Sequence, residues 1–221
     1  MFQDQYLELL LTSGVLRFGE FKTKSGRLSP YFFNMGALDS GERLGKAADV
    51  YAQVIERAFG PQVENLFGPA YKGIPLAVMT SHALARRLGR DVSFTFNRKE
   101  AKDHGEGGTL VGRQYEGGEK VVVIEDVITG GTSFSETLPV LRKAGVDVVG
   151  VVVGVDRQER GQGSKGALAE VAGTWGVKTA SIVTIADVVA RLHNRTVAGK
   201  VWIDDATKAR IRDYLATYGA S

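Results

Sequence analysis

The sequence predicts an α/β fold with a central parallel sheet flanked by helices. Short apolar runs rich in Val and Ile, of which 121–124 and 148–155 are the clearest, are typical of strands buried on both faces. Segments with apolar residues at helical spacing, such as 42–59, alternate with these runs. Two Gly-rich turns that carry charged residues follow expected strands, which is where α/β proteins place their binding loops.

Composition limits the functional classes. The 221 residues suffice for one well-buried domain, and we expect that single domain to span residues 1–221. There is no Cys, which excludes disulfides and thiolate metal sites, and no apolar run is long enough for a membrane span. The net charge of +3 comes from scattered Lys and Arg, so no broad nucleic-acid face is evident. We expect a cytoplasmic protein with neither membrane nor nucleic acid as a partner.

Residues 1 to about 16 have the spacing of an amphipathic helix, and a basic hairpin is expected after it. A solvent-facing hairpin does not explain the three consecutive aromatics Tyr31, Phe32 and Phe33. Alternate residues of a strand point to opposite faces, so at least one ring must cover something else, such as a flat heterocycle. We expect residues 1–36 to form a small hood over the binding edge of the sheet.

The first Gly-rich turn, Gly68–Gly73, contains Lys72. We expect it between a strand at 63–67 and a helix from about 74 to 88. An ordinary β–α connector accounts for the glycines. A lysine at a helix start that already favours anions is less ordinary and indicates an anion-binding loop.

The stretch 97–112 is charged and then Gly-rich, with little to pack, so we expect a mobile loop after a strand at 92–96. Its basic group consists of Arg98, Lys99, Lys102 and His104. A solvated loop is the simplest interpretation. The glycines that follow could equally act as hinges of a lid over an anionic substrate.

The region 121–133 is the segment around which we expect the binding site to be built. An apolar strand ends at Glu125 and Asp126, and small residues follow from 129 to 133. A helix is expected to begin there with Ser133 and Glu136 as a capping box. Backbone amides and the helix dipole would then cradle a phosphate, while the acids suit ribose hydroxyls or a divalent cation held through water. An ordinary turn does not explain two adjacent acids at a strand end, where repulsion is costly.

The remaining elements complete the sheet. Pro139 either kinks the expected helix or shows that it starts later. The strand 148–155 leads to Arg157, for which a surface ion pair is the simplest interpretation. A last core strand is expected at 180–184, with helices at 188–192 and 204–218. His82 and His193 lack ligand partners at suitable spacing, and we interpret both as structural.

Four segments resemble known motifs, in the same order along the chain. Residues 121–133 resemble the phosphoribosyl pyrophosphate (PRPP) motif of type I phosphoribosyltransferases. Phe-Lys-Thr-Lys-Ser-Gly-Arg at 21–27, with Ser-Pro-Tyr-Phe-Phe-Asn at 29–34, is similar to the N-terminal signature of orotate phosphoribosyltransferases. The basic loop resembles that family's catalytic loop, Arg-Lys-x-x-Lys-x-His-Gly, and Asp-Arg-Gln-Glu-Arg-Gly at 156–161 resembles its orotate segment.

The resemblance implies a type I phosphoribosyltransferase fold and transfer of phosphoribose from PRPP to orotate. The products would be orotidine 5′-monophosphate and pyrophosphate, in pyrimidine (UMP) biosynthesis. It places the catalytic residues at Arg98, Lys99, Lys102, His104 and Asp126. It places PRPP on Lys24, Tyr71, Lys72, Arg98, Lys99, Lys102, His104, Glu125, Asp126, Val127, Ile128, Thr129, Gly130, Gly131, Thr132 and Ser133. Orotate is placed on Phe32, Phe33, Thr129 and Arg157.

The resemblance also implies Mg²⁺ as cofactor, arriving with the PRPP pyrophosphate near Glu125 and Asp126 and without a direct protein site. It further implies a homodimer in which each catalytic loop reaches the neighbouring subunit. Two alternatives share the central motif. A purine-base phosphoribosyltransferase has no need of Phe32, Phe33 and Arg157, and a PRPP-sensing nucleic-acid-binding regulator would need a broad basic face.

Overall fold

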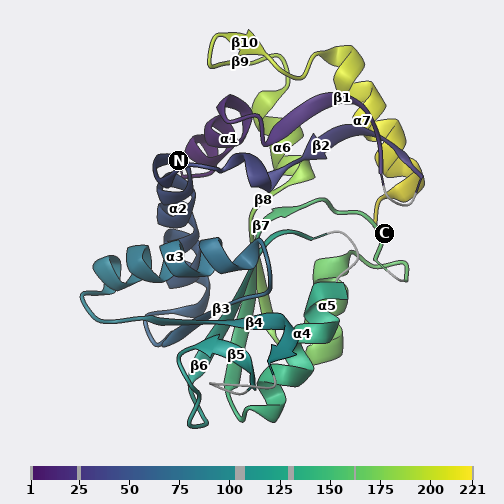
Figure 1. The fold of residues 1–221 in the computed structure, drawn as a ribbon. Helices are drawn as coiled ribbons and strands as arrows, with labels where there is room; N and C mark the ends of the chain where they lie inside the picture. The colour runs from purple at the N-terminus through teal and green to yellow at the C-terminus, as the bar shows by residue number, and fades with distance from the viewer. Residues whose placement is uncertain (1, 24–25, 103–107, 129–131, 162, 221) are drawn as a thin grey trace.

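A six-stranded sheet with strand order β5-β4-β3-β6-β7-β8 runs through the molecule (Figure 1). The computed structural model describes residues 2–23, 26–102, 108–128, 132–161 and 163–220. All neighbouring strands are parallel except β5, which pairs antiparallel with β4. The strands are β3 (Asn65–Gly68), β4 (Ser93–Lys102), β5 (Gly108–Gly112), β6 (Lys120–Ile128), β7 (Asp147–Asp156) and β8 (Lys178–Thr184). The parallel sheet expected from the sequence is confirmed.

Alternate residues of β6 enter two separate cores, as a strand buried on both faces requires. Val122 and Ile124 pack in the core that includes the inner sides of α2 (Gly41–Phe59) and α3 (Gly73–Leu88). Val121 and Val123 pack in the core formed with α4 (Thr132–Lys143) and α5 (Ala167–Trp175). Each fully buried side chain of this size contributes about 1.5–3 kcal/mol, so β6 is fixed from both sides.

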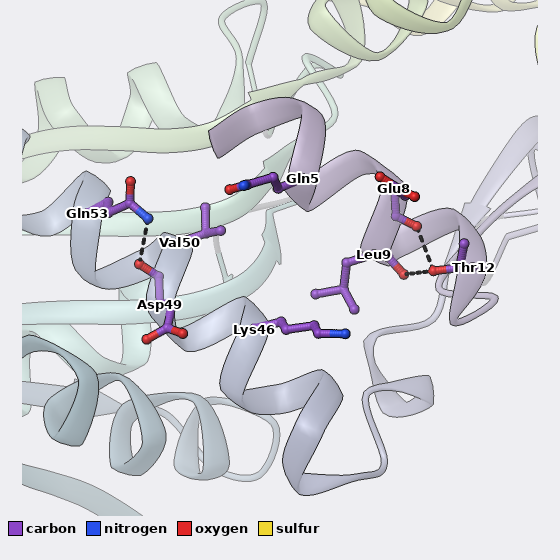
Figure 2. Close-up of a pocket in the computed structure, with 8 residues that line it drawn as sticks. All are labelled: Gln5, Glu8, Leu9, Thr12, Lys46, Asp49, Val50 and Gln53. Carbon is purple, nitrogen blue, oxygen red and sulfur yellow. Dashed lines mark hydrogen bonds between the residues drawn. The ribbon is translucent and has the colours of Figure 1, made fainter. Parts of the chain in front are cut away.

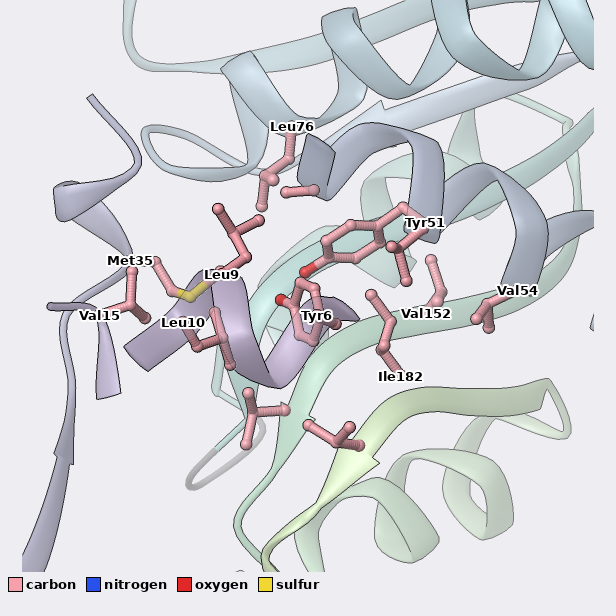
Figure 3. Packing of buried hydrophobic residues seen from close by; sticks show 14 of the residues in the cluster. Tyr6, Leu9, Leu10, Val15, Met35, Tyr51, Val54, Leu76, Val152 and Ile182 are labelled. Atoms are coloured by element: carbon pink, nitrogen blue, oxygen red, sulfur yellow. The ribbon is translucent and has the colours of Figure 1, made fainter. Parts of the chain in front are cut away.

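Helix α1 (Phe2–Thr12) belongs to the first of these cores and packs against α2 (Figure 3). Tyr6 and Leu10 of α1 are fully buried. The outer side of the junction is a polar hollow lined by Gln5 and Glu8 of α1 and by Lys46 of α2 (Figure 2). Amphipathic spacing therefore places α1 correctly, with its apolar side inward.

The hood is an antiparallel pair, β1 (Leu16–Lys22) and β2 (Leu28–Phe33), followed by the 3₁₀ turn Met35–Ala37. The C-terminal helix α7 (Asp205–Tyr218) packs against β2, and the rings of Tyr31 and Tyr214 meet at 5.7 Å. Asp204 caps α7 by accepting a hydrogen bond from Thr207 N, as the acids at this helix start suggested. The same end of the molecule carries α6 (Ile185–Leu192) and the short strands β9 (Thr196–Val197) and β10 (Lys200–Val201) (Figure 1).

Two expectations about local structure are wrong. Residues 97–102 and 108–112 are strand, since β4 continues to Lys102 and pairs with β5, where Leu110 packs on the second core. Residues 103–107 of the expected loop lie outside the described residues. Ser133 does not cap α4, since the helix already begins at Thr132 and the Ser133 hydroxyl donates to Glu125 instead. Pro139 lies inside α4.

Within the described residues, no helix combines the length and apolar character that a bilayer crossing requires.

Candidate active site

The site lies at the carboxyl edge of the sheet, where β3, β6 and β7 end. Register pairs Phe67 of β3 with Val123, and Ile128 at the end of β6 with Asp156 at the end of β7. The turn after β3, the acids of β6 and Arg157 after β7 therefore share one edge, where binding loops of such sheets converge.

Glu125 lies near the carboxyl end of β6 and is held there by Ser133, whose hydroxyl donates to its Oε2 at 2.7 Å. Burial, with a smaller effect from the neighbouring Asp126 charge, raises the pKa of Glu125 to about 7, against the lowering by Ser133. The carboxyl group is thus able to hold or release a proton near neutral pH.

Asp126 is 8% exposed, and one of its carboxylate oxygens accepts a hydrogen bond from Val127 N at 2.7 Å. The other oxygen lies 3.4 Å from the Nζ atom of Lys72, which comes from the turn after β3. The structure therefore brings together two predicted PRPP residues from segments 54 positions apart, leaving the Lys72 side chain more than half exposed towards solvent.

The turn between β3 and α3 depends on the close contact of two glycines, Gly68 and Gly73. A Cβ on Gly68 would lie 2.2 Å from Gly73 O, so no side chain fits there. The Asn97 side chain fixes the turn by accepting a hydrogen bond from Ala70 N at 3.0 Å. Next in the turn, Tyr71 is 66% exposed, and the Lys99 ammonium lies 4.8 Å from the centre of its ring. The Ala70–Tyr71 peptide is cis.

The two adjacent phenylalanines of β2, Phe32 and Phe33, point to opposite faces of the strand. Phe33 is buried with Tyr31, whereas Phe32 is 40% exposed and stacks on Phe21 at 5.4 Å. The argument from strand alternation identified a ring outside the core, and that ring is Phe32. It offers a flat apolar face at the hood surface.

Arg157 is not a surface residue, because it is 8% exposed and paired with the buried Glu159. Its Nε and Nη2 atoms both donate to Glu159 Oε1, at 2.8 and 2.6 Å. Tyr31 Oη donates to the same oxygen at 3.0 Å, and the guanidinium lies over the Tyr31 ring. The interpretation as a surface ion pair is therefore wrong: Arg157 joins the end of β7 to the hood.

Several predicted site residues lie outside the described part of the chain. These are Lys24, His104, Thr129, Gly130 and Gly131, together with the side chains of Lys102 and Thr132. Among the described ones, Val127 and Ile128 pack against the cores, so only their backbone could meet a ligand. Arg98 is half-buried beside Lys99 at the start of the β4–β5 hairpin.

Sequence reasoning missed three residues that shape this edge: Asn97, Glu159 and Tyr51, whose hydroxyl donates to Glu125 O at 2.9 Å. Asn97 had a signal, since it is a polar residue at the end of a strand. Tyr51 had none, because its helical spacing marks it only as a core residue.

The donors at this edge fit a metal that arrives with its own ligands. Among the described residues, no group of three His, Asp or Glu side chains lies close enough to hold an ion. Carboxylate oxygens of Glu125 and Asp126 are the hard donors that Mg²⁺ prefers, with water and phosphate completing its shell.

Comparisons with known proteins agree with this geometry. Residues 35–171 match the phosphoribosyl transferase domain family. The chain is 48% identical to an orotate phosphoribosyltransferase of Lachnoclostridium phytofermentans, covering 99% of this chain and 97% of that one. It is 46% identical to one of Thioalkalivibrio sulfidiphilus, covering 99% and 98%.

Solved structures give the same result. The crystal structure of an orotate phosphoribosyltransferase of Francisella tularensis superposes with a TM-score of 0.82 at 34% identity, covering 97% of this chain and 99% of that one. UMP synthase of Leishmania donovani superposes with a TM-score of 0.74 at 26% identity, and this chain spans 42% of it. Since the similarity to the bacterial enzymes extends over the whole chain, the protein belongs to the orotate phosphoribosyltransferase family.

Proposed function

We propose that this protein transfers phosphoribose from PRPP to a ring nitrogen of orotate, giving orotidine 5′-monophosphate and pyrophosphate. The observation that carries the proposal is the meeting of Lys72, the Glu125–Asp126 pair and Arg157 at one edge of the sheet. It occurs in a chain that matches orotate phosphoribosyltransferases from end to end. A phosphoribose donor needs cations for its pyrophosphate and acceptors for its ribose, and this edge supplies both.

The catalytic requirement of this reaction is to stabilise the charges that develop in its transition state. A ribosyl centre that loses pyrophosphate passes through an oxocarbenium-like state, so negative charge must be stabilised on the leaving side. Lys72, Lys99 and Arg98 are the described cations on that side, and the turn held by Asn97 positions the first of them. Asp126, which lies beside Lys72, would accept hydrogen bonds from the ribose hydroxyls.

Mg²⁺ is proposed to accompany PRPP and to neutralise charge on the pyrophosphate. Glu125 and Asp126 would receive it through water and the ribose hydroxyls. The nearby Lys72 ammonium opposes a further cation bound directly to Asp126, which favours arrival with the anionic substrate.

Orotate is proposed to lie between the hood and the end of β7. Phe32 offers a flat face for the ring, and Arg157 the charge for the carboxylate. Glu159 occupies Nε and Nη2 of Arg157, so Nη1 is the nitrogen without a hydrogen bond to a described residue. It is the natural donor for the substrate.

We further propose that the protein acts as a cytoplasmic homodimer whose β4–β5 hairpin closes the neighbouring site. The support is family membership and the position of the basic residues on a hairpin at the edge of the sheet, where β5 has no further neighbour in the described sheet.

The function is tested by mixing the protein with PRPP, Mg²⁺ and orotate and following the loss of orotate absorbance. Turnover is expected with orotate and not with adenine or hypoxanthine as a matched control. Turnover with a purine base and none with orotate would overturn the assignment.

A further inference from the structure

We infer that Tyr51 is a positioning residue that sets the main chain beneath Asp126, with Gly154 providing the space for its hydroxyl. The inference rests on the proposed function, because it assigns Asp126 to the ribose of PRPP. Tyr51 belongs to α2, far from the site in sequence, and does not touch the substrate.

The hydroxyl of Tyr51 reaches the strand that carries the acids. It is fully buried and donates to the main-chain carbonyl of Glu125 at 2.9 Å. Burial raises the pKa of Tyr51 well above its ordinary value, so the hydroxyl keeps its proton at any working pH. This hydrogen bond is therefore a permanent link between α2 and the end of β6.

The register of β6 and β7 is unchanged where this link is made. Glu125 pairs with Val153 and Val127 with Val155, which sets Asp126 opposite Gly154. A Cβ on Gly154 would lie 2.3 Å from the Tyr51 hydroxyl and 2.8 Å from Asp126 O. The missing side chain of Gly154 thus leaves room for both oxygens, and the Tyr51 hydrogen bond supports the main chain of β6 beside Asp126.

Tyr6 provides a matched control within the same core (Figure 3). Its ring meets that of Tyr51 edge to face at 6.1 Å, and both residues are fully buried. A Cβ on Gly154 would also lie 2.3 Å from the Tyr6 hydroxyl. The Tyr6 hydroxyl, however, lies beside that of Tyr51 (Figure 3) and makes no hydrogen bond to the described residues of β6. Both tyrosines are thus fully buried in the same core, but only Tyr51 donates a hydrogen bond to β6.

The first experiment compares Tyr51→Phe with Tyr6→Phe, each of which removes one oxygen and keeps the ring. Tyr51→Phe is expected to lower kcat/KM for PRPP by about 3- to 10-fold, the loss expected for one buried hydrogen bond, with the KM for orotate unchanged. Tyr6→Phe should change kcat/KM by less than about twofold. Equal effects of the two variants would overturn the inference.

The second experiment asks whether Tyr51 acts through Asp126. Calorimetry measures the binding of PRPP with Mg²⁺ to the wild type, Tyr51→Phe, Asp126→Asn and the double variant. Tyr51→Phe should weaken binding in the wild type and have no further effect on Asp126→Asn. A full effect in both backgrounds would overturn the inference. Because binding is measured without turnover, a failed orotate assay would refute the proposed function and leave this test standing.

A third measurement separates positioning from stability. Gly154→Ala should lower the melting temperature, because its methyl group meets both hydroxyls. Adding Tyr6→Phe and Tyr51→Phe removes those oxygens and should restore part of the stability, because the contact of the methyl group with Asp126 O remains, while PRPP binding stays as weak as in Tyr51→Phe. Recovery of binding together with stability would show that Tyr51 serves packing alone and would overturn the inference.

Discussion

Glu125 and Asp126 are adjacent acids with different surroundings. Asp126 is buried and faces Lys72 and a backbone amide, whereas Glu125 is half-buried and bonded to the hydroxyl of Ser133. The sequence alone predicts both acids at the strand end, because a run of Val and Ile stops there. It does not predict the different partners of the two acids, since these depend on where α4 and the turn after β3 lie relative to β6.

The first prediction concerns Glu125. Its pKa rises from 4.5 to about 7 on folding, so between these pH values the folded protein holds a proton that the unfolded chain has lost. Stability from this group is thus fully present below about pH 4.5 and is lost as pH rises to about 7. Relative to Glu125→Gln, the free energy of unfolding of the wild type should fall by up to roughly 3 kcal/mol between pH 5 and pH 8. Urea unfolding at both pH values measures this, and a difference that stays constant would contradict it.

The second prediction concerns Arg157, which has a substrate role and a structural role. Arg157→Ala is expected to raise the KM for orotate by about 10- to 150-fold and that for PRPP far less. It should also cost about 3–5 kcal/mol of stability, because Glu159 is left buried without its main partner.

Glu159→Gln is the control, since it breaks the same ion pair but leaves Arg157 in place. Its melting temperature should fall while its KM for orotate does not rise. If both variants raise the KM for orotate equally, Arg157 acts only by holding the hood.

At the scale of elements, periodicity locates α2, β7 and α7 within a residue or two, because each buries a regular apolar pattern. It fails at 97–102 and 108–112, where charged and small residues show no strand pattern. These two segments are strands because their backbones pair with each other. It also fails at Ser133, whose hydroxyl bonds Glu125, eight residues earlier, in place of its own helix. Both errors come from contacts that no local pattern contains.

The third prediction concerns the turn from β3 to α3. Gly68→Ala places a methyl group against Gly73 O, so it should separate the turn from α3 and weaken PRPP binding together with stability. Gly173→Ala in α5 is the matched control, because a Cβ there meets nothing within 4 Å. The control should stabilise the protein by about 0.4–1 kcal/mol and leave binding unchanged. Calorimetry with PRPP and thermal unfolding separate the two, and normal PRPP binding by Gly68→Ala would contradict the role of the turn.

At the scale of the whole molecule, the C-terminal segment holds the hood over the sheet. Arg160 N donates to Tyr218 O and Ala220 N to Gln158 O, so the end of the chain pairs with the segment after β7. Tyr214 of α7 packs on Tyr31 of the hood at 5.7 Å. The sequence indicates a hood at the N-terminus. That the hood is held by α7, through Tyr214, follows only from the folded chain.

The last prediction concerns sharing of the site between subunits. Lys102 is the last residue of β4, next to the edge strand β5, and Asp126 lies near the carboxyl end of β6, two strands away in the order β4-β3-β6. If the hairpin completes the neighbour's site, Lys102→Ala and Asp126→Asn damage the same site from different subunits. Each variant alone should be inactive. A mixed dimer, in contrast, has one site with both lesions and one site with none.

Mixing the two variants after dissociation tests this arrangement. Random pairing makes about half of the dimers mixed, each with one intact site, so roughly a quarter of wild-type activity should return. If each hairpin closed over its own subunit, every site would keep one lesion and nothing would return. Subunit exchange is confirmed with a size tag on one variant. Confirmed exchange without recovery would refute the shared site, because hybrid dimers would then be present and every site in them would still carry a lesion.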